Sequence, residues 1–161
     1  MKQVLVINGH PDKQSFNWAL AQAYTDGARK TDSTIWQLNI TDLKFNPNLS
    51  FGYRQKTELE PDLLDAIDKL QKADHIVWVF PMRWYGYPAL MKGFIYRTFL
   101  PGITFQPVEG KAFPNKLLQG ITYRIIVTAD TPRWYDYLFM TSPTIHQLKQ
   151  RTFQFSWVSP V

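Results

Sequence analysis

Residues 4–17 constrain the fold of this chain most strongly, because they predict a buried strand, a sharp turn and the first turn of a helix in succession. Residues 4–7 are an unbroken apolar run, which is typical of a strand covered on both faces of a parallel sheet. Asn-Gly and Pro-Asp pairs then interrupt the run, and Ser15 is a good N-cap for the helix that follows. This stretch predicts an α/β fold.

The turn within this stretch is a candidate phosphate site. A helix that starts directly after a strand points free backbone N–H groups and the positive end of its dipole at the turn. His10, Ser15 and Asn17 add side-chain donors there. An ordinary strand–helix connection with a capped helix is the alternative, and the spacing alone favours neither. The buried face predicted for the helix consists of Phe16, Ala19, Leu20, Ala23 and Tyr24.

Three further helices are predicted downstream. Thr57 and Glu60 have the spacing of a capping box, and Pro61 suits the first turn of a helix. The buried face of that helix is predicted to be Leu63, Leu64, Ile67 and Leu70. A helix that is apolar almost all round is predicted from Pro88 to about residue 99, and such a helix is buried on more than one side. A short helix capped by Ser142 is predicted to end near residue 150.

Strands are predicted at residues 34–38, 75–80 and 121–128, and an alternating pattern at 153–157 predicts an incomplete fifth strand. This alternation of strands and helices predicts a doubly wound parallel sheet with strand order 2-1-3-4-5, and one domain over residues 1–161. The long connections at 39–57 and 101–120 are predicted to be irregular. In that order the loops at 9–15, 81–86 and 129–135 line one crevice, which favours a ligand site there.

Composition narrows the function further. Of the 161 residues, 45% are hydrophobic and 16% aromatic, which suits one domain with a real core and pockets for flat ligands. Cysteine is absent, a strand follows Met1 at once, and no apolar run is long enough to cross a bilayer, so a cytoplasmic protein is expected. The net charge of +5 comes from Lys and Arg residues that are scattered along the chain and form no basic cluster. Nucleic acid is therefore the least favoured of the possible binding partners.

Trp84 and Tyr85 indicate the kind of ligand that the crevice takes. An aromatic pair followed by glycine suits a flat ring, while packing against the next helix is the alternative. No Gly-x-Gly-x-x-Gly motif or P-loop is present, and the three histidines form no metal-binding or hydrolytic pattern. His75 is expected to be structural and His146 to lie on the surface. The reaction itself should therefore be carried out by a bound cofactor. A flavin would provide both a phosphate for the first loop and a flat ring for the aromatic pair.

Two segments together resemble a known family. Residues 8–17 contain Asn-Gly-His-Pro-x-x-x-Ser-Phe-Asn, and residues 80–93 read Phe-Pro-Met-Arg-Trp-Tyr-Gly-Tyr-Pro-Ala-Leu-Met-Lys-Gly. These are similar to the flavodoxin-like NAD(P)H:quinone oxidoreductases, which include the mammalian quinone reductases, the bacterial modulator of drug activity B and ancillary subunits of potassium-efflux systems. Arg97 and the Pro101-Gly102 turn also fit the pattern. The resemblance implies a homodimeric flavoprotein, with FMN or FAD, that passes two electrons from NAD(P)H to a quinone-like acceptor.

The resemblance also implies a role for individual residues. The phosphate side of the flavin would be held by His10, Ser15, Phe16 and Asn17. The isoalloxazine ring would be wrapped by Pro81, Met82, Arg83, Trp84 and Tyr85. The far edge would be closed by Thr128, Ala129 and Asp130. NAD(P)H and acceptor would use the same flavin face in turn, with Arg83 steadying the reduced flavin and with Tyr85 and Tyr135 as the substrate-contacting catalytic candidates.

Two departures from the family pattern bear on these roles. Many members carry a Thr-Thr-Gly-Gly-like run after the fourth strand, followed by a Tyr and a His that assist hydride transfer. Here residues 128–132 read Thr-Ala-Asp-Thr-Pro, and Tyr135 and Tyr137 are close by without a His, so no assisting acid is assigned. Family chains also continue for about one strand and one helix more, which leaves a fragment, a shortened gene product and a subgroup with a bare sheet edge as open explanations.

Two rival functions share these motifs. One is a flavin-bearing regulatory or ancillary subunit of a transporter with weak turnover. The other is a truncated, flavin-free relic of the fold. The sequence does not choose between FMN and FAD, between NADH and NADPH, or among acceptors.

Overall fold

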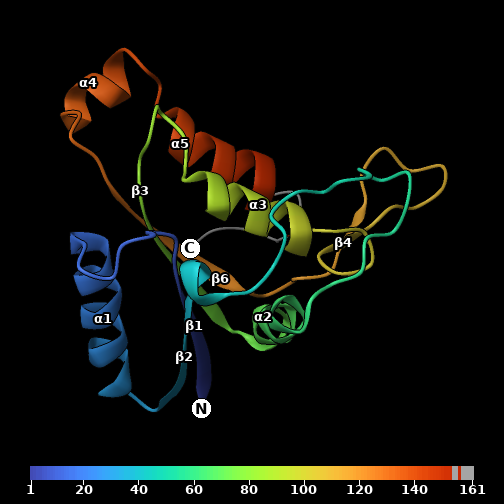
Figure 1. Cartoon of the computed structure of the whole chain (residues 1–161), viewed down its shortest axis with the longest axis horizontal. Helices are drawn as coiled ribbons and strands as arrows, with labels where there is room; N and C mark the ends of the chain where they lie inside the picture. Colours follow the sequence, from blue (N-terminus) through green and yellow to red (C-terminus); the bar gives the residue numbers. More distant parts are fainter. Residues whose placement is uncertain (154–155, 157–161) are drawn as a thin grey trace.

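A four-stranded parallel sheet forms the centre of the molecule in the computed structural model, which describes residues 1–153 and 156 (Figure 1). The sheet has the order β2-β1-β3-β6, with parallel pairing throughout. Its strands are β1 (Lys2–Asn8), β2 (Ser33–Asn39), β3 (His75–Pro81) and β6 (Thr122–Thr128). The predicted strands and the order 2-1-3-4 are confirmed. Within the described residues, no fifth strand pairs with β6.

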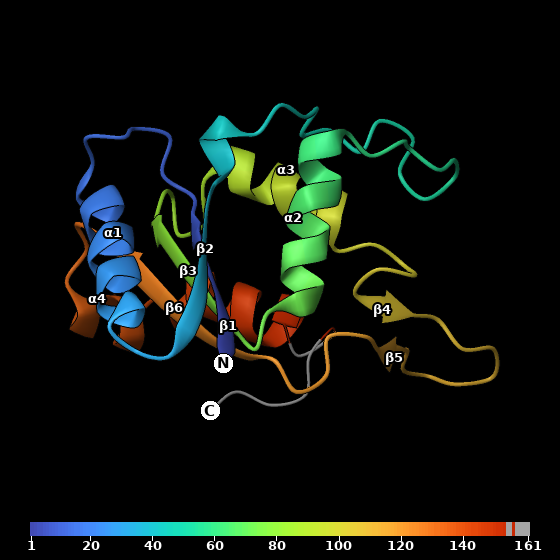
Figure 2. The ribbon, with the colours of Figure 1, turned by 90° about the horizontal axis from the view of Figure 1, so that it is seen from below.

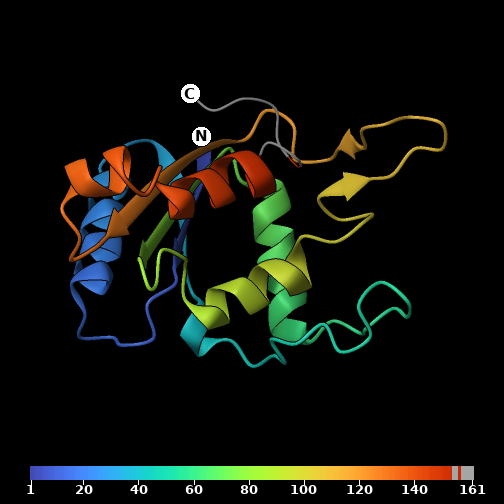
Figure 3. The ribbon, with the colours of Figure 1, turned by 90° about the horizontal axis from the view of Figure 1, so that it is seen from above.

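Helices cover both faces of the sheet (Figures 2 and 3). One face packs against α1 (Phe16–Arg29), and the other against α2 (Pro61–Lys72) and α3 (Ala89–Thr98). Alternate side chains of β1 separate into the two layers, because successive residues of a strand point to opposite faces: Val4 and Val6 pack towards α1, while Leu5 and Ile7 pack towards α2 and α3. This explains why the strand is apolar without interruption.

Short elements complete the fold. They are the 3₁₀ turn η1 (Ile40–Asp42), the hairpin strands β4 (Phe105–Gln106) and β5 (Asn115–Lys116), the helices α4 (Arg133–Leu138) and α5 (Pro143–His146), and the π-helical turns η2 (Gln147–Phe153). Three of them correct predictions: β4 and β5 pair within a stretch expected to be irregular, and α4 begins within the loop expected at 129–135. Each helix among the described residues is too short or too polar to cross a membrane.

The apolar face predicted for α1 is right for Leu20 and Tyr24, which are partly buried against the core, and wrong for the other three residues. The predicted residues that turn out to be exposed are Phe16, Ala19 and Ala23, and the residues buried in their place are Asn17, Ala21 and Thr25. Both polar residues have partners, because the Asn17 Nδ2 donates to Thr128 Oγ1 at 2.8 Å and Thr25 Oγ1 donates to Gln37 Oε1 at 3.5 Å. A polar side chain is tolerated inside a protein when it is hydrogen-bonded, and apolar periodicity does not reveal such partners.

The start of α2 also differs from the prediction. Pro61 does open the helix, but Glu60 is its N-cap and makes no side-chain capping bond, so the capping box is wrong. The Glu60 carboxylate instead contacts Arg97 on α3. On the buried face of α2, Ala66 takes the place expected for Leu64, whose side chain is 53% exposed.

The end of the described chain differs as well. Ser142 has a φ of 48° and makes no side-chain capping bond, although a helix does start at the next residue. That helix continues as η2 to Phe153, so Phe153 is helical and does not begin a strand. Residues 154, 155 and 157 of the predicted fifth strand lie outside the described residues.

His75 is held at the amino end of β3 by neighbours from two other elements. Its Nε2 lies 3.3 Å from the Tyr24 hydroxyl on α1, and its Nδ1 lies 2.6 Å from Thr122 Oγ1 on β6. Burial, together with the positive charges of Arg124 and Lys2, lowers the pKa of His75 below its usual 6.5. The expected structural role is consistent with these contacts.

Stability is therefore expected to fall in mild acid. As the pH drops below about 6.5, His75 becomes protonated in the unfolded chain but stays neutral in the folded chain, where its pKa is lower. The free energy of unfolding therefore decreases between about pH 6.5 and the lower pKa of the folded state. Urea titrations between pH 7.5 and 5 should show this decrease, and His75→Gln should reduce it. The exposed His146 provides the control, because His146→Gln also removes a histidine but leaves the contacts of His75 intact. An equal effect of the two substitutions would contradict the assignment.

Candidate functional site

Thr128, the last residue of β6, is hydrogen-bonded to two other segments at the carboxyl edge of the sheet. Its hydroxyl accepts a hydrogen bond from Asn17 Nδ2 at 2.8 Å, and its backbone carbonyl accepts one from the Met82 N–H at 2.7 Å. These bonds connect residues that are far apart in the chain: Thr128 at the end of β6, Met82 directly after β3, and Asn17 in the first turn of α1. The parallel register explains the meeting, because Pro81 lies opposite Thr128 and Asn8 lies opposite Val79.

The loop after β1 is shaped by a series of local hydrogen bonds. The Asn8 side chain accepts from the His10 N–H at 3.1 Å, and His10 Nδ1 accepts from the Asp12 N–H at 3.0 Å. Because Nδ1 is an acceptor, a neutral His10 ring carries its proton on Nε2. Ser15 caps α1 as predicted, since its Oγ accepts from the Trp18 N–H at 3.2 Å. Phe16 begins the helix with its side chain 68% exposed.

Gly9 lies where this loop passes closely over α3. A Cβ at this position would lie 2.9 Å from Met91 Sδ and 3.2 Å from Phe80 Cβ, which is closer than ordinary contacts allow. The loop therefore sits directly on the end of β3 and on α3. The Gly9 N–H also donates to the Val79 carbonyl at 2.8 Å.

The loop after β3 is a tight turn with unusual backbone angles. Arg83 and Gly86 exchange backbone hydrogen bonds of 2.8 and 2.9 Å, and between them Trp84 and Tyr85 have φ values of 48° and 55°. Positive φ costs a residue with a Cβ on the order of 1–2 kcal/mol, so Asn or Gly usually occupies such turns. The Trp84 side chain is 100% exposed, so the alternative that Trp84 packs against the following helix is wrong. Strain together with exposure points to a functional role for the turn.

The remaining predicted site residues are spread over β3, the segment after β6 and α4. Pro81 is the last residue of β3 and is buried, not part of the loop as predicted. Ala129 and Asp130 follow β6 and are exposed. Met82 and Ala129 share an open cleft of about 770 Å³, which runs along β6 to α4 and α5. Tyr135 lies on α4, 39% exposed, and its ring stacks on Phe139 at 5.1 Å.

Buried polar atoms lie beneath the first loop. Asn8 and Asn17 are 0% and 3% exposed, and within the part of the chain that the structure describes, Asn8 Nδ2 and Asn17 Oδ1 have no hydrogen-bond partner. One is a donor and the other an acceptor, and buried groups of this kind usually have partners. Asn8 was missed as a site residue, although an Asn that directly follows an apolar strand is a usable signal. Among the described residues, no three His, Asp or Glu side chains gather as metal ligands.

Comparison with known proteins identifies the fold. The sequence profile of a family described by its flavodoxin-like fold matches residues 2–161. The chain belongs to this family. The resemblance to NAD(P)H:quinone oxidoreductases, predicted from two loop motifs, is confirmed by its relatives. NAD(P)H dehydrogenase (quinone) 1 of Cavia porcellus is 27% identical over 128 residues, which cover 65% of this chain and 46% of the relative. The chain thus spans about half the length of this curated relative.

Solved structures share the same fold. NAD(P)H:quinone oxidoreductase from Methanothermobacter marburgensis superposes with a TM-score of 0.78 at 17% identity, covering 99% of this chain and 85% of that one. An FMN-dependent NADH-azoreductase from Bacillus anthracis, solved in complex with FMN, superposes with a TM-score of 0.72 at 17% identity, covering 97% and 84%. These similarities establish the flavodoxin-like architecture, a doubly wound α/β sheet.

Proposed function

We propose that this chain is the flavin-binding domain of a cytoplasmic, homodimeric oxidoreductase that passes a hydride from NAD(P)H to quinone-like acceptors. The observation that carries the proposal is the meeting of the first turn of α1 and the loop after β3 at Thr128, with unpaired polar atoms of Asn8 and Asn17 buried at the same edge of the sheet. The names of its relatives supply the reaction class. One domain over residues 1–161 and FMN as the flavin are part of the proposal, the latter by analogy with the azoreductase complex.

The first loop and the start of α1 would hold the flavin phosphate. The first backbone N–H groups of a helix lack partners within the helix, and the dipole favours an anion there. Ser15 already uses its oxygen to accept from the Trp18 N–H, so only its hydroxyl proton is available to a phosphate. The Nε2–H of His10 would add a second donor. Asn17 would be oriented from behind by its bond to Thr128.

The turn at Trp84 and Tyr85 would hold the ring system. When bound, the flavin supplies a two-electron hydride carrier. The strained turn keeps the Trp84 side chain out of the core. In this exposed position its ring can cover a flat ligand and exclude water. Exposed Arg83 would offset the negative charge of the reduced ring. Tyr85 would orient the acceptor, and alternate use of one face by NAD(P)H and acceptor would give ping-pong kinetics. Tyr135, whose ring stacks on Phe139 at the end of α4, would be a second substrate contact.

The test is flavin binding followed by turnover. Purified protein is titrated into FMN and separately into FAD, and binding is followed by quenching of flavin fluorescence and by the visible spectrum. Saturable binding of one flavin per chain is expected, followed by oxidation of NAD(P)H that depends on added quinone and shows parallel double-reciprocal lines. Failure to bind either flavin would overturn the proposal. Tight flavin binding without quinone turnover would favour the ancillary subunit instead, and light scattering checks the dimer.

A further inference from the structure

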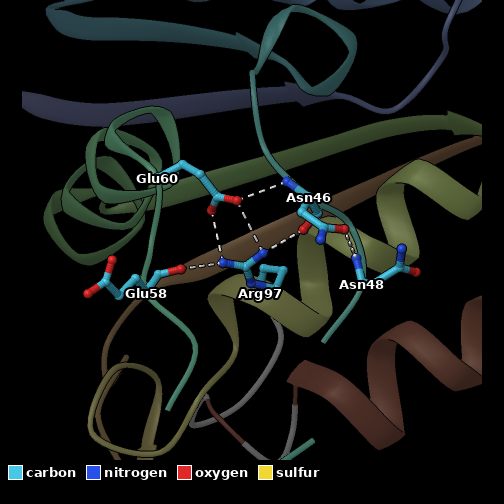
Figure 4. Close-up of polar contacts among 5 residues, drawn as sticks. All are labelled: Asn46, Asn48, Glu58, Glu60 and Arg97. Carbon is cyan, nitrogen blue, oxygen red and sulfur yellow. Dashed lines mark hydrogen bonds and ion pairs between the residues drawn. The ribbon is translucent and has the colours of Figure 1, made fainter. Parts of the chain in front are cut away.

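A single side chain holds both ends of the long loop between η1 and α2. Residues 43–59 contain no helix or strand. Near the start of this loop the Asn46 carbonyl accepts from Arg97 Nη1 at 2.6 Å, and near its end the Glu58 carbonyl accepts from Arg97 Nη2, also at 2.6 Å (Figure 4). The two ends are therefore held side by side on one guanidinium, which projects from α3.

Glu60 completes the contact from the other side. Its carboxylate accepts from both Arg97 Nη atoms, at 3.3 and 2.9 Å, and its Oε1 also accepts the Asn46 N–H at 2.9 Å. The Arg97 side chain is 1% exposed and the Glu60 side chain 30% exposed, and an Arg–carboxylate fork of this kind is geometrically specific. Burial would raise the pKa of Glu60, but hydrogen bonds from the N–H groups of Asn46 and Glu60 and the charge of Arg97 together lower it.

The start of the loop is also pressed against α3. A Cβ on Gly93 would lie 2.3 Å from Pro47 Cβ and 2.8 Å from the Pro47 Cα and carbonyl oxygen. Only a glycine allows the loop to approach the helix so closely. Two independent contacts therefore hold this end of the loop against α3: the polar contact of Arg97 with Asn46 and the close packing of Gly93 against Pro47.

The middle of the loop is exposed. Residues 50–56 are all exposed, and the Tyr53 side chain, 75% exposed, borders three clefts of about 510, 720 and 510 Å³. Lys92 and Tyr96 of α3 line the first two of these clefts, and the third extends along residues 100–103. A loop with a closed neck and an exposed tip is an Ω-loop, a type of segment that is often functional.

We propose that Arg97 and Glu60 are positioning residues that form a clasp: they close the neck of the loop at residues 46–60 and thereby hold Tyr53 as the wall shared by the three clefts. Opening the clasp frees the loop while the sheet and its helices stay folded. Local opening of this kind is expected for a segment with few buried contacts beyond its neck. The proposal is independent of whether the chain binds a flavin.

Limited trypsin digestion of the full chain tests the clasp. Arg54 and Lys56 are cleavage sites within the loop tip, and exposed Lys111, between β4 and β5, is an internal reference. Glu60→Gln removes the carboxylate, whereas Glu58→Gln removes the same charge from a residue that contributes only its carbonyl (Figure 4). Glu60→Gln should speed cleavage after residues 54 and 56 at least about tenfold with no change after Lys111, and Glu58→Gln should change neither.

Two outcomes overturn the clasp. One is cleavage of the Glu60→Gln loop at the wild-type rate. The other is an equal acceleration after Lys111, which would show global destabilisation instead of loop release. Gly93→Ala is a second variant that displaces the Pro47 end sterically, and it should accelerate the same loop sites.

A spin label gives a second measurement, because the chain lacks cysteine and Ser50→Cys at the exposed tip is a unique attachment site. With the clasp intact, label mobility should increase only as acid protonates Glu60, whereas in the Glu60→Gln background the label should be mobile at every pH. A label whose mobility is the same in both backgrounds, at all pH values, would also overturn the proposal.

Discussion

Replacing Arg97 with methionine is expected to lower the free energy of unfolding by about 3 kcal/mol or more. Methionine keeps much of the buried apolar stem, so little packing is lost. The loss instead leaves the Glu60 carboxylate without its counter-charge and removes the donors from the Asn46 and Glu58 carbonyls. Acceptors that methionine covers without supplying a donor cost more than the net gain of the bonds themselves.

Urea unfolding followed by tryptophan fluorescence measures this loss, and the melting temperature should fall by roughly 6–12 °C for a domain of this size. Arg97→Lys is the matched comparison. It keeps the positive charge but cannot form the fork to the Glu60 carboxylate while also reaching both carbonyls, so a smaller loss is expected. A methionine variant within about 1 kcal/mol of wild type would contradict the importance of this cluster for stability.

Trp84→Gly is expected to make the protein more stable and to weaken flavin binding at the same time. Glycine adopts positive φ without a Cβ conflict, and the fully exposed Trp84 ring contributes no packing, so a gain of about 0.5–1 kcal/mol is expected after allowing for the flexibility of glycine in the unfolded chain. If the ring covers the flavin, its loss should reduce flavin affinity at least about tenfold, which corresponds to about 1.4 kcal/mol.

The two effects are measured separately, by urea unfolding without flavin and by fluorescence titration with FMN. Trp84→Phe is the control, since it keeps both an aromatic ring and the positive φ and should stay near wild type in both measurements. A glycine variant that binds FMN as tightly as wild type would remove Trp84 from the site. A glycine variant that is less stable would instead mean that the turn is not strained.

Much of the fold could be predicted from the sequence because it is recorded in local patterns. The apolar run at 4–7 and the one at 75–80 are strands covered on both faces, and their alternation with amphipathic segments led to the observed strand order. The start of α1 and the loop after β3 do meet at Thr128, since in a parallel sheet all strands end at the same edge. Their assignment to a flavin remains a prediction.

The errors have a common cause. Thr25 and the Nδ2 group of Asn17 are buried on α1 with hydrogen-bond partners on β2 and β6, while the apolar Phe16 is exposed. Glu60 has the spacing of a capping residue, yet its carboxylate contacts Arg97, 37 residues away. Hydrogen-bond partners distant in sequence outweighed local preference in these cases.

The sequence by itself determined the α/β class, the strand order and the position of the loops that face one edge of the sheet, because hydrophobic periodicity and turn residues act over short stretches of chain. Only the tertiary structure decided which polar side chains are buried, that the Trp84 turn has positive φ, and that one arginine closes a loop between residues 46 and 60. These features depend on partners brought together by folding, and the choice among such partners is not recorded in any local pattern.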